Sequence, residues 1–207
     1  MWSQRSQDVR FHTVRSMLKI NVSDTVLDFG CGTGAFIDYL PYERRTLMDI
    51  VTSGLPSDPM ITYYGLDWSE GMRARARREH PHAVILPELD DDLVFDHVVC
   101  IGPFNLSDGW SKEQTWETLE ELWTLHTAAS LVVSLYREAG RTPSTMLGYS
   151  PTDAAELVAR LGSPPFVLRS DHLPNDLILG VYRVADRHGA PAELPAGDVG
   201  RQQDPRG

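Results

Sequence analysis

Apolar residues recur along the chain in two patterns, the spacing of an amphipathic helix and the short runs of buried strands. Helical spacing occurs first over residues 8–19, where the apolar side of the predicted helix consists of Val9, Val14, Met17 and Leu18. Short apolar runs predict seven strands, at residues 25–29, 62–66, 83–86, 97–101, 131–136, 166–170 and 177–184. The two kinds of segment alternate, and no internal repeat is present.

Cap signals mark several helix boundaries. A helix is predicted after a run of glycines, at 34–40, Ser111 with Gln114 forms a capping box, and Ser150 followed by a proline opens a later helix. Strands that alternate with helices predict a doubly wound parallel sheet. Residues 171–176 are too few for a crossover between the last two strands. The predicted fold is therefore α/β, a Rossmann-like sheet of seven strands, mostly parallel, with a C-terminal antiparallel hairpin.

Length and composition are those of one globular domain. The chain has 207 residues, of which 42% are hydrophobic, and no apolar run approaches the length of a membrane span. We expect the domain to cover residues 1–186 and the Pro-, Gly- and Ala-rich segment 187–207 to be a disordered tail. The two cysteines, Cys31 and Cys100, lack the spacing of metal ligands or of a disulfide framework.

The charge of the chain argues against a nucleic-acid partner. The net charge is −10, and the single basic run, Arg73 to Arg78, spreads its arginines around a predicted helix rather than along one face. Duplex binding is therefore disfavoured, and the run is interpreted as a solvated surface. The first residues carry charge but no following apolar stretch, so no secretory signal is expected and the cytoplasm is the expected location.

The stretch VLDFGCGTGAF, residues 26–36, predicts a buried strand, a tight turn and the start of a helix, an arrangement that holds a ligand. It fits a dinucleotide fingerprint only loosely. Asp28, two residues before the first glycine, would repel a pyrophosphate and attract an ammonium group. Ribose hydroxyls call for a second acid, either Asp49 or Asp67, and we choose Asp67 because a better strand precedes it and Ser69 after it can cap a helix.

The segments VLDFGCGTG, GLDWSEGM and FDHVVCIGPFNL together resemble the motif series of class I S-adenosylmethionine-dependent methyltransferases, over most of residues 24–136. The resemblance implies that S-adenosylmethionine is the cofactor. Its methionine part would contact Asp28 and the turn, its ribose Asp67, and its adenine Trp68 and Met72. Glu88 and Leu89 would lie at the adenine edge, although PELDDD departs from the commoner Gly-Asp pair. The remaining cofactor positions that the resemblance implies are Gly30, Cys31, Gly32, Thr33, Gly34 and Gly102.

The ends of the chain are similar to a small group of bacterial-type methyltransferases, through MWSQRSQDVRF, CIGPFNL and SDHLPNDLILGVYR. The opening Trp, Ser-Gln and Arg-Phe recur in that group. This implies that Gln7 and Arg10 cap the cofactor, with Arg10 facing its carboxylate. The alternative for Arg10 is a surface charge on a helix.

Methyl transfer from a sulfonium needs alignment and a dry pocket, and a base only where the acceptor must lose a proton. Residues at the carboxyl ends of the strands share the cofactor's edge, and the candidates there are His172, paired with Asp171, together with Asn105 and Tyr136. The alternative for Asp171 and His172 is a pair that stabilises the turn. His126 should face the opposite edge and be structural. Cys100 should be a small core residue. No metal is expected, because metal-dependent methyl transfer of the catechol type would need an acid at residues 100–102.

The leading hypothesis is a methyltransferase that acts on O or N of a small-molecule acceptor. A nucleic-acid base methyltransferase is an alternative, but GPFN stands where that class has a DPPY-like tetrad. A non-catalytic S-adenosylmethionine-binding partner protein is another, and a dinucleotide-dependent dehydrogenase would depend on Asp49. The long segment 41–61 is expected to have a structural or dimer role, and monomer and homodimer both remain open.

Overall fold

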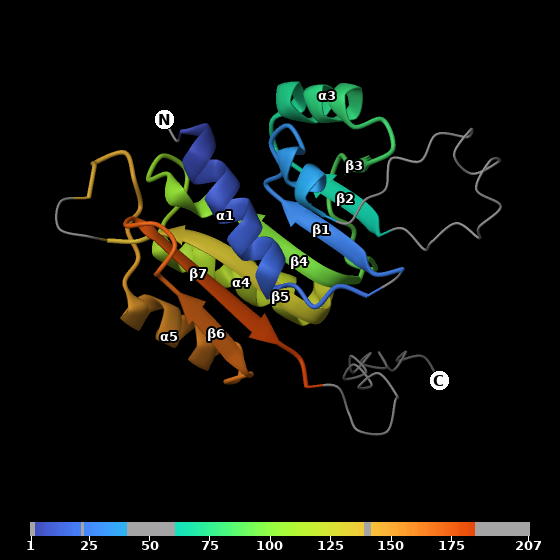
Figure 1. Cartoon of the computed structure of the whole chain (residues 1–207). Coiled ribbons are helices and arrows are strands. Elements are labelled where there is room, and N and C mark those ends of the chain that lie inside the picture. The colour runs from blue at the N-terminus through green and yellow to red at the C-terminus, as the bar shows by residue number, and fades with distance from the viewer. Residues whose placement is uncertain (1–2, 22, 41–60, 139–141, 185–207) are drawn as a thin grey trace, which may run out of the picture.

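A computed structural model describes residues 3–21, 23–40, 61–138 and 142–184 (Figure 1). Its centre is a seven-stranded sheet in the order β3-β2-β1-β4-β5-β7-β6. The strands are β1 Thr25–Phe29, β2 Thr62–Leu66, β3 Val84–Leu86, β4 Phe95–Ile101, β5 Thr127–Tyr136, β6 Phe166–Arg169 and β7 Asp176–Tyr182. Strands β1 to β5 pair in parallel, whereas β7 runs antiparallel to both β5 and β6. The predicted fold class is confirmed.

Helices cover both faces of the sheet (Figure 1). They are α1 Gln4–Met17, η1 Ala35–Tyr39, α3 Glu70–Glu79, η2 Pro103–Asn105, α4 Lys112–His126 and α5 Pro151–Arg160. One hydrophobic cluster joins α1 and η1 to the sheet through Val14, Phe36 and Val99. A second joins α4 and α5 to the other face, through residues such as Leu119 and Leu157. The sheet is thus buried on both faces, as its near-continuous apolar strands require.

The observed boundaries differ from the predicted ones for local reasons. Helix α1 begins at Gln4, before the predicted start, because Ser3 caps it by accepting a hydrogen bond from the Ser6 amide. The predicted helix after the glycines is a 3₁₀ helix of five residues. The capping box of Ser111 and Gln114 is confirmed, and Ser150 forms a second box with Asp153.

The order of the strands places the ligand-binding edge. The chain proceeds outward from β1 to β2 and β3 on one side, and from β4 to β5 on the other, so the strand order reverses between β1 and β4. In open α/β sheets the ligand lies at the carboxyl ends of the strands next to such a reversal. The glycine turn after β1 lies at this point.

Two predicted segments fall outside the described residues. They are the long segment 41–61, of which only Ile61 is described, and the tail 187–207. Asp49 belongs to the first of them. Of the helices that are described, none combines the length and apolar character needed to cross a membrane.

Candidate functional site

The glycine turn is held against the neighbouring strand ends. The amides of Gly30 and Cys31 both donate to the Leu66 carbonyl at the end of β2, over 2.8 and 2.9 Å. A Cβ on Gly30 would lie only 2.7 Å from the Pro103 Cβ, so η2 approaches the turn as closely as glycine allows. Positive φ angles occur at Gly30 (79°), Gly32 (56°) and Gly34 (79°). The turn is therefore a fixed element between β1, β2 and β4.

Two buried carboxylates flank this turn. Asp28, in β1, is 2% exposed, and its Oδ2 accepts a hydrogen bond of 2.8 Å from the Tyr63 hydroxyl. Burial raises the pKa of Asp28 to about 7; the Tyr63 hydrogen bond opposes this shift and the nearby Asp67 adds to it. Asp67 follows β2, and its two oxygens accept 2.9 Å hydrogen bonds from the amides of Gly32 and Ser69. The preferred second acid thus lies directly on the turn.

A cavity of about 180 Å³ opens beside the turn, between the sheet and α1. Its wall is formed by Gln7, Arg10, Phe11, Asp28, Gly30, Cys31, Gly32, Thr33, Ala35 and Ile101. Arg10 is 4% exposed, and its Nε donates to Oδ2 of Asp176 over 2.6 Å. Burial lowers the pKa of Arg10, and the charge of Asp176 opposes that shift. Because Arg10 is buried, the alternative of a surface charge at this position is wrong. Both Gln7 and Arg10 line the cavity beside the turn.

The residues assigned to adenine lie farther out. Trp68, directly after Asp67, is 58% exposed, with its ring beside those of Phe29 and Trp110 at centroid distances of 6.4 and 6.0 Å. Met72 is also exposed, in the first turn of α3. The remaining predicted positions lie outside the cavity wall: Glu88 is exposed, Leu89 packs on the core, and Gly102 precedes η2 in a left-handed conformation.

His172, the candidate base, contacts Asp176 and not the predicted Asp171. Asp171 is exposed and forms two hydrogen bonds with Arg169, whereas Nε2 of His172 lies 3.1 Å from Oδ2 of Asp176. The pairing of His172 with Asp171 is therefore wrong. Asp176 also accepts from Arg10 at Oδ2 and from Ser134 at Oδ1, so its carboxylate is an acceptor throughout and Nε2 of His172 is the donor.

The other two candidates lie at the same edge of the sheet. Asn105 ends η2, is 2% exposed, and accepts a hydrogen bond from the Tyr136 amide at 2.6 Å through its Oδ1. Tyr136 is the last residue of β5 and lies opposite Asp176 in the β5–β7 register. Asn105 and His172 are therefore attached to the same pair of strand ends.

Two residues expected to be structural are so. His126 is buried, and its Nδ1 donates to the Leu93 carbonyl over 2.7 Å, near the amino end of β4. Cys100 is fully buried in β4, and burial raises the pKa of its thiol well above the usual value, so it is not a nucleophile.

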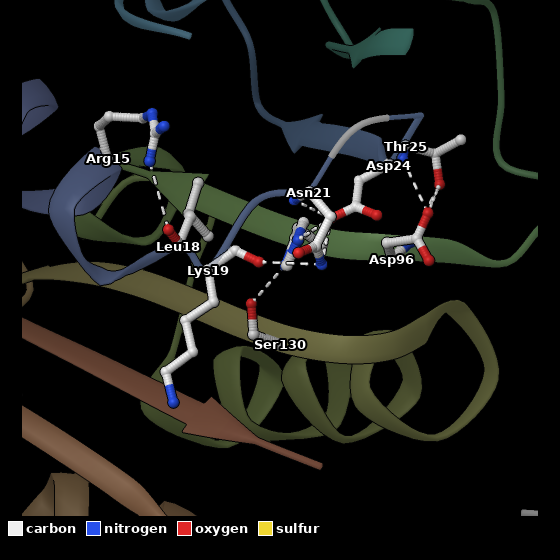
Figure 2. Close-up of polar contacts among 9 residues, drawn as sticks. Arg15, Leu18, Lys19, Asn21, Asp24, Thr25, Asp96 and Ser130 are labelled. Carbon is white, nitrogen blue, oxygen red and sulfur yellow. Dashed lines mark hydrogen bonds and ion pairs between the residues drawn. The ribbon is translucent and has the colours of Figure 1, made fainter. Parts of the chain in front are cut away.

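A further polar cluster, which the sequence analysis missed, ties together the amino ends of β1, β4 and β5 (Figure 2). His97 contacts Asp24 Oδ2 through Nε2 at 3.0 Å and Ser130 Oγ through Nδ1 at 2.7 Å. Next to it, Asp96 accepts from both the amide and the hydroxyl of Thr25. An Asp-His-Ser chain can activate a serine for hydrolysis. Here His97 and Ser130 are each 2% exposed and lie at the edge away from the glycine turn, so the cluster fastens strands.

Comparisons with known proteins agree with this geometry at the level of the fold. The sequence matches no protein-family model and no curated protein. Solved structures similar to it include CalS10, an amino pentose methyltransferase from Micromonospora echinaspora with bound S-adenosylmethionine, at a TM-score of 0.57 and 15% identity over 89% of this chain and 92% of that one. The CurJ carbon methyltransferase gives a TM-score of 0.60 and 12% identity over 88% and 56% of the two chains.

The methyltransferase domain of bacterial CtHen1 is similar as well, with a TM-score of 0.59 and 12% identity over 86% of this chain and all of that one. The chain thus spans little more than half of CurJ but nearly all of CalS10. The fold that these proteins share with it is that of class I S-adenosylmethionine-dependent methyltransferases.

Proposed function

We propose that the chain binds S-adenosylmethionine at the glycine turn and transfers its methyl group to O or N of a small-molecule acceptor. The observation that carries this proposal is the grouping of charges around the turn. Asp28 and Asp67 flank it, and Arg10 reaches the same cavity from α1. A ligand that bears both an ammonium group and a carboxylate matches this arrangement, and a pyrophosphate does not.

The residues present fit this cofactor from one end to the other. Asp28 and the turn would hold the amino-acid end, with Arg10 at its carboxylate, and Asp67 would accept from the ribose hydroxyls. The cavity, about 180 Å³, is smaller than the roughly 300–1,000 Å³ of most small-molecule sites, so it suits one end of the ligand. Trp68 and Met72 supply an exposed apolar surface beyond Asp67 for the adenine. When bound, the cofactor supplies an activated methyl group.

A nucleic-acid base is a poorer acceptor for this site. In the alternative hypothesis Phe104, within GPFN, would clamp a flipped base. Its side chain is fully buried instead, with ring centroids 4.8 Å from Trp110 and 6.0 Å from Phe29. It could hold a base only by leaving the core. The similarity to CalS10, which acts on an amino pentose, favours a small acceptor.

Calorimetric titration of the full chain with S-adenosylmethionine, S-adenosylhomocysteine and NAD tests the proposal. We expect the two adenosyl ligands to bind and Asp67→Asn to weaken both at least about tenfold, which corresponds to one charged hydrogen bond. Asp91→Asn, an exposed acid after β3, is the matched control and should change neither affinity. Binding of NAD in place of the adenosyl ligands would refute the proposal. Binding with no methyl transfer to any hydroxyl or amine acceptor would indicate a non-catalytic binding protein.

A further inference from the structure

Two buried polar atoms at the carboxyl edge of the sheet have no hydrogen-bond partner among the described residues. They are Nδ1 of His172 and the side-chain amide nitrogen of Asn105. Both side chains are almost fully buried, His172 at 4% exposure and Asn105 at 2%. Such atoms are rare in folded proteins because each loses its hydration without replacement. Their presence at a ligand-binding edge indicates that a ligand supplies the missing partners.

The two atoms are held by the same strand ends. Asn105 is fixed through its oxygen, which accepts from the amide of Tyr136, and Tyr136 lies opposite Asp176 in the β5–β7 register. His172 is fixed through Nε2, which donates to Asp176. In each case one polar atom is bound to this strand pair and the other remains available. The glycine turn lies at the same edge.

The fixed hydrogen bonds define which partner each available atom requires. In a neutral ring that donates from Nε2, Nδ1 has a bare lone pair and requires a donor. The Asn105 amide nitrogen requires an acceptor. A hydroxyl or an amine that still carries hydrogen offers both a donor and an acceptor. A carboxylate, a thioether or a tertiary amine leaves Nδ1 without a partner.

Charged groups from three neighbouring elements surround His172. Its carboxylate partner Asp176 lies on β7, and Arg10 approaches from α1. Arg169, at the end of β6, pairs with the exposed Asp171 just before His172. Asp176 fixes the ring and stabilises an imidazolium, as the acid does in an Asp-His pair that serves a base. The neighbouring Asp171, Pro174 and Asn175 are exposed, so the connection lies at the surface.

We propose that His172 and Asn105 bind the methyl acceptor through one hydroxyl or hydrogen-bearing amine, that His172 takes up its proton, and that Asp176 positions His172. The inference rests on the function proposed above. The acceptor's lone pair forms the bond to the methyl carbon, the carbon–sulfur bond of the donor breaks with its electron pair left on sulfur, and the acceptor's proton goes to Nδ1. The imidazolium then returns that proton to solvent.

Nitrogen NMR of the full chain with labelled histidine and asparagine tests this without any turnover. Phenol is the probe, because it carries a single hydroxyl, and Phe104, the residue before Asn105, packs its ring against Trp110. Anisole is the matched control, since its oxygen accepts a hydrogen bond but donates none. The spectra of His172→Gln and Asn105→Asp assign the two signals; the aspartate retains an oxygen for the Tyr136 amide.

With S-adenosylhomocysteine bound, phenol should shift both the His172 Nδ1 signal and the Asn105 amide signal, and anisole only the latter. His126, near the opposite edge, should respond to neither. Asp176→Asn should populate the other tautomer of His172. A proton on Nδ1 in the free protein, equal effects of phenol and anisole on His172, or no effect of phenol would each overturn the inference. The titration with S-adenosylhomocysteine reports the cofactor site separately, so failure there contradicts the proposed function instead.

Discussion

The carboxyl group of Asp28 lies beneath the glycine turn, where burial raises its pKa to about 7. If the ionised form binds the ammonium group of the cofactor, the affinity for S-adenosylhomocysteine should fall about tenfold from about pH 8 to about pH 6, as the ionised fraction falls. Calorimetry across this range measures the effect. The Asp28→Asn variant should bind weakly, with an affinity that does not change over this pH range. It is also the control for the ligand, because titration of the ligand would change the affinity of both proteins.

Tyr63 supplies a sharper control on the same carboxyl group. Its hydroxyl donates to Asp28 and lowers the pKa of that group, so Tyr63→Phe should move the midpoint of the binding profile to higher pH. A midpoint that does not move would mean that some other group controls the pH dependence.

The same raised pKa predicts a cost in stability. Between about pH 4 and about pH 7 the unfolded chain has lost the Asp28 proton and the folded chain retains it, so the free energy of unfolding falls as pH rises through this range. Asp28→Asn removes this dependence and should be more stable than the wild type above pH 7, by at most about 4 kcal/mol. Urea unfolding at both ends of the range measures the difference. If Asp28→Asn is no more stable than the wild type above pH 7, burial does not raise the pKa of Asp28.

At the scale of elements, the turn after β1 contains one glycine that packs against η2, Gly30, and one that faces open space, Gly32. Gly30→Ala places a methyl group against the Pro103 ring at a positive φ and should lower the free energy of unfolding by about 2–4 kcal/mol. Gly32→Ala also has a positive φ, but no atom lies within 4 Å of its new Cβ, so about 1 kcal/mol is expected. Denaturant unfolding compares the two. Equal losses would show that backbone conformation, and not the approach of η2, limits the turn.

The turn, its strand and the second acid could be predicted because their signals are local. Apolar runs, glycines and the cap at Ser69 each act over a few residues, and Asp67 could be preferred to Asp49 on those grounds alone. The start of β5 was missed because Thr127 and Ser130 are polar, although their side chains bond within the fold. Asp96 was missed in β4 for the same reason, since its partner Thr25 is 71 residues away.

The contacts that complete the site are set by the sheet and not by spacing along the chain. Arg10 and Asp176 are 166 residues apart, and only the β5–β7 pairing and the crossing of α1 bring them together. His172 was a reasonable candidate because topology places its connection at the ligand edge. Its partner could not be found in the same way, since Asp171 is adjacent in sequence but extends toward Arg169.

For the whole molecule, the distribution of charge limits the choice of acceptor. The net charge is −10, and the basic run in α3 is largely neutralised within its own helix. Arg73 and Arg77 pair with Glu70, and Arg75 with Glu79 at 2.6 Å. The interpretation of this run as a solvated surface agrees with those pairs. A phosphate backbone would meet no uncompensated basic face along α3.

This predicts that the chain does not bind nucleic acid at physiological salt. In a fluorescence anisotropy titration with a short labelled duplex and the matching single strand, no saturable binding is expected, with or without S-adenosylhomocysteine. Replacing both acidic partners in α3, as Glu70→Arg with Glu79→Arg, should create a basic surface and produce weak binding that salt abolishes. That variant shows that the assay detects backbone contacts. Tight binding by the wild type would contradict this prediction and would restore a base as the acceptor.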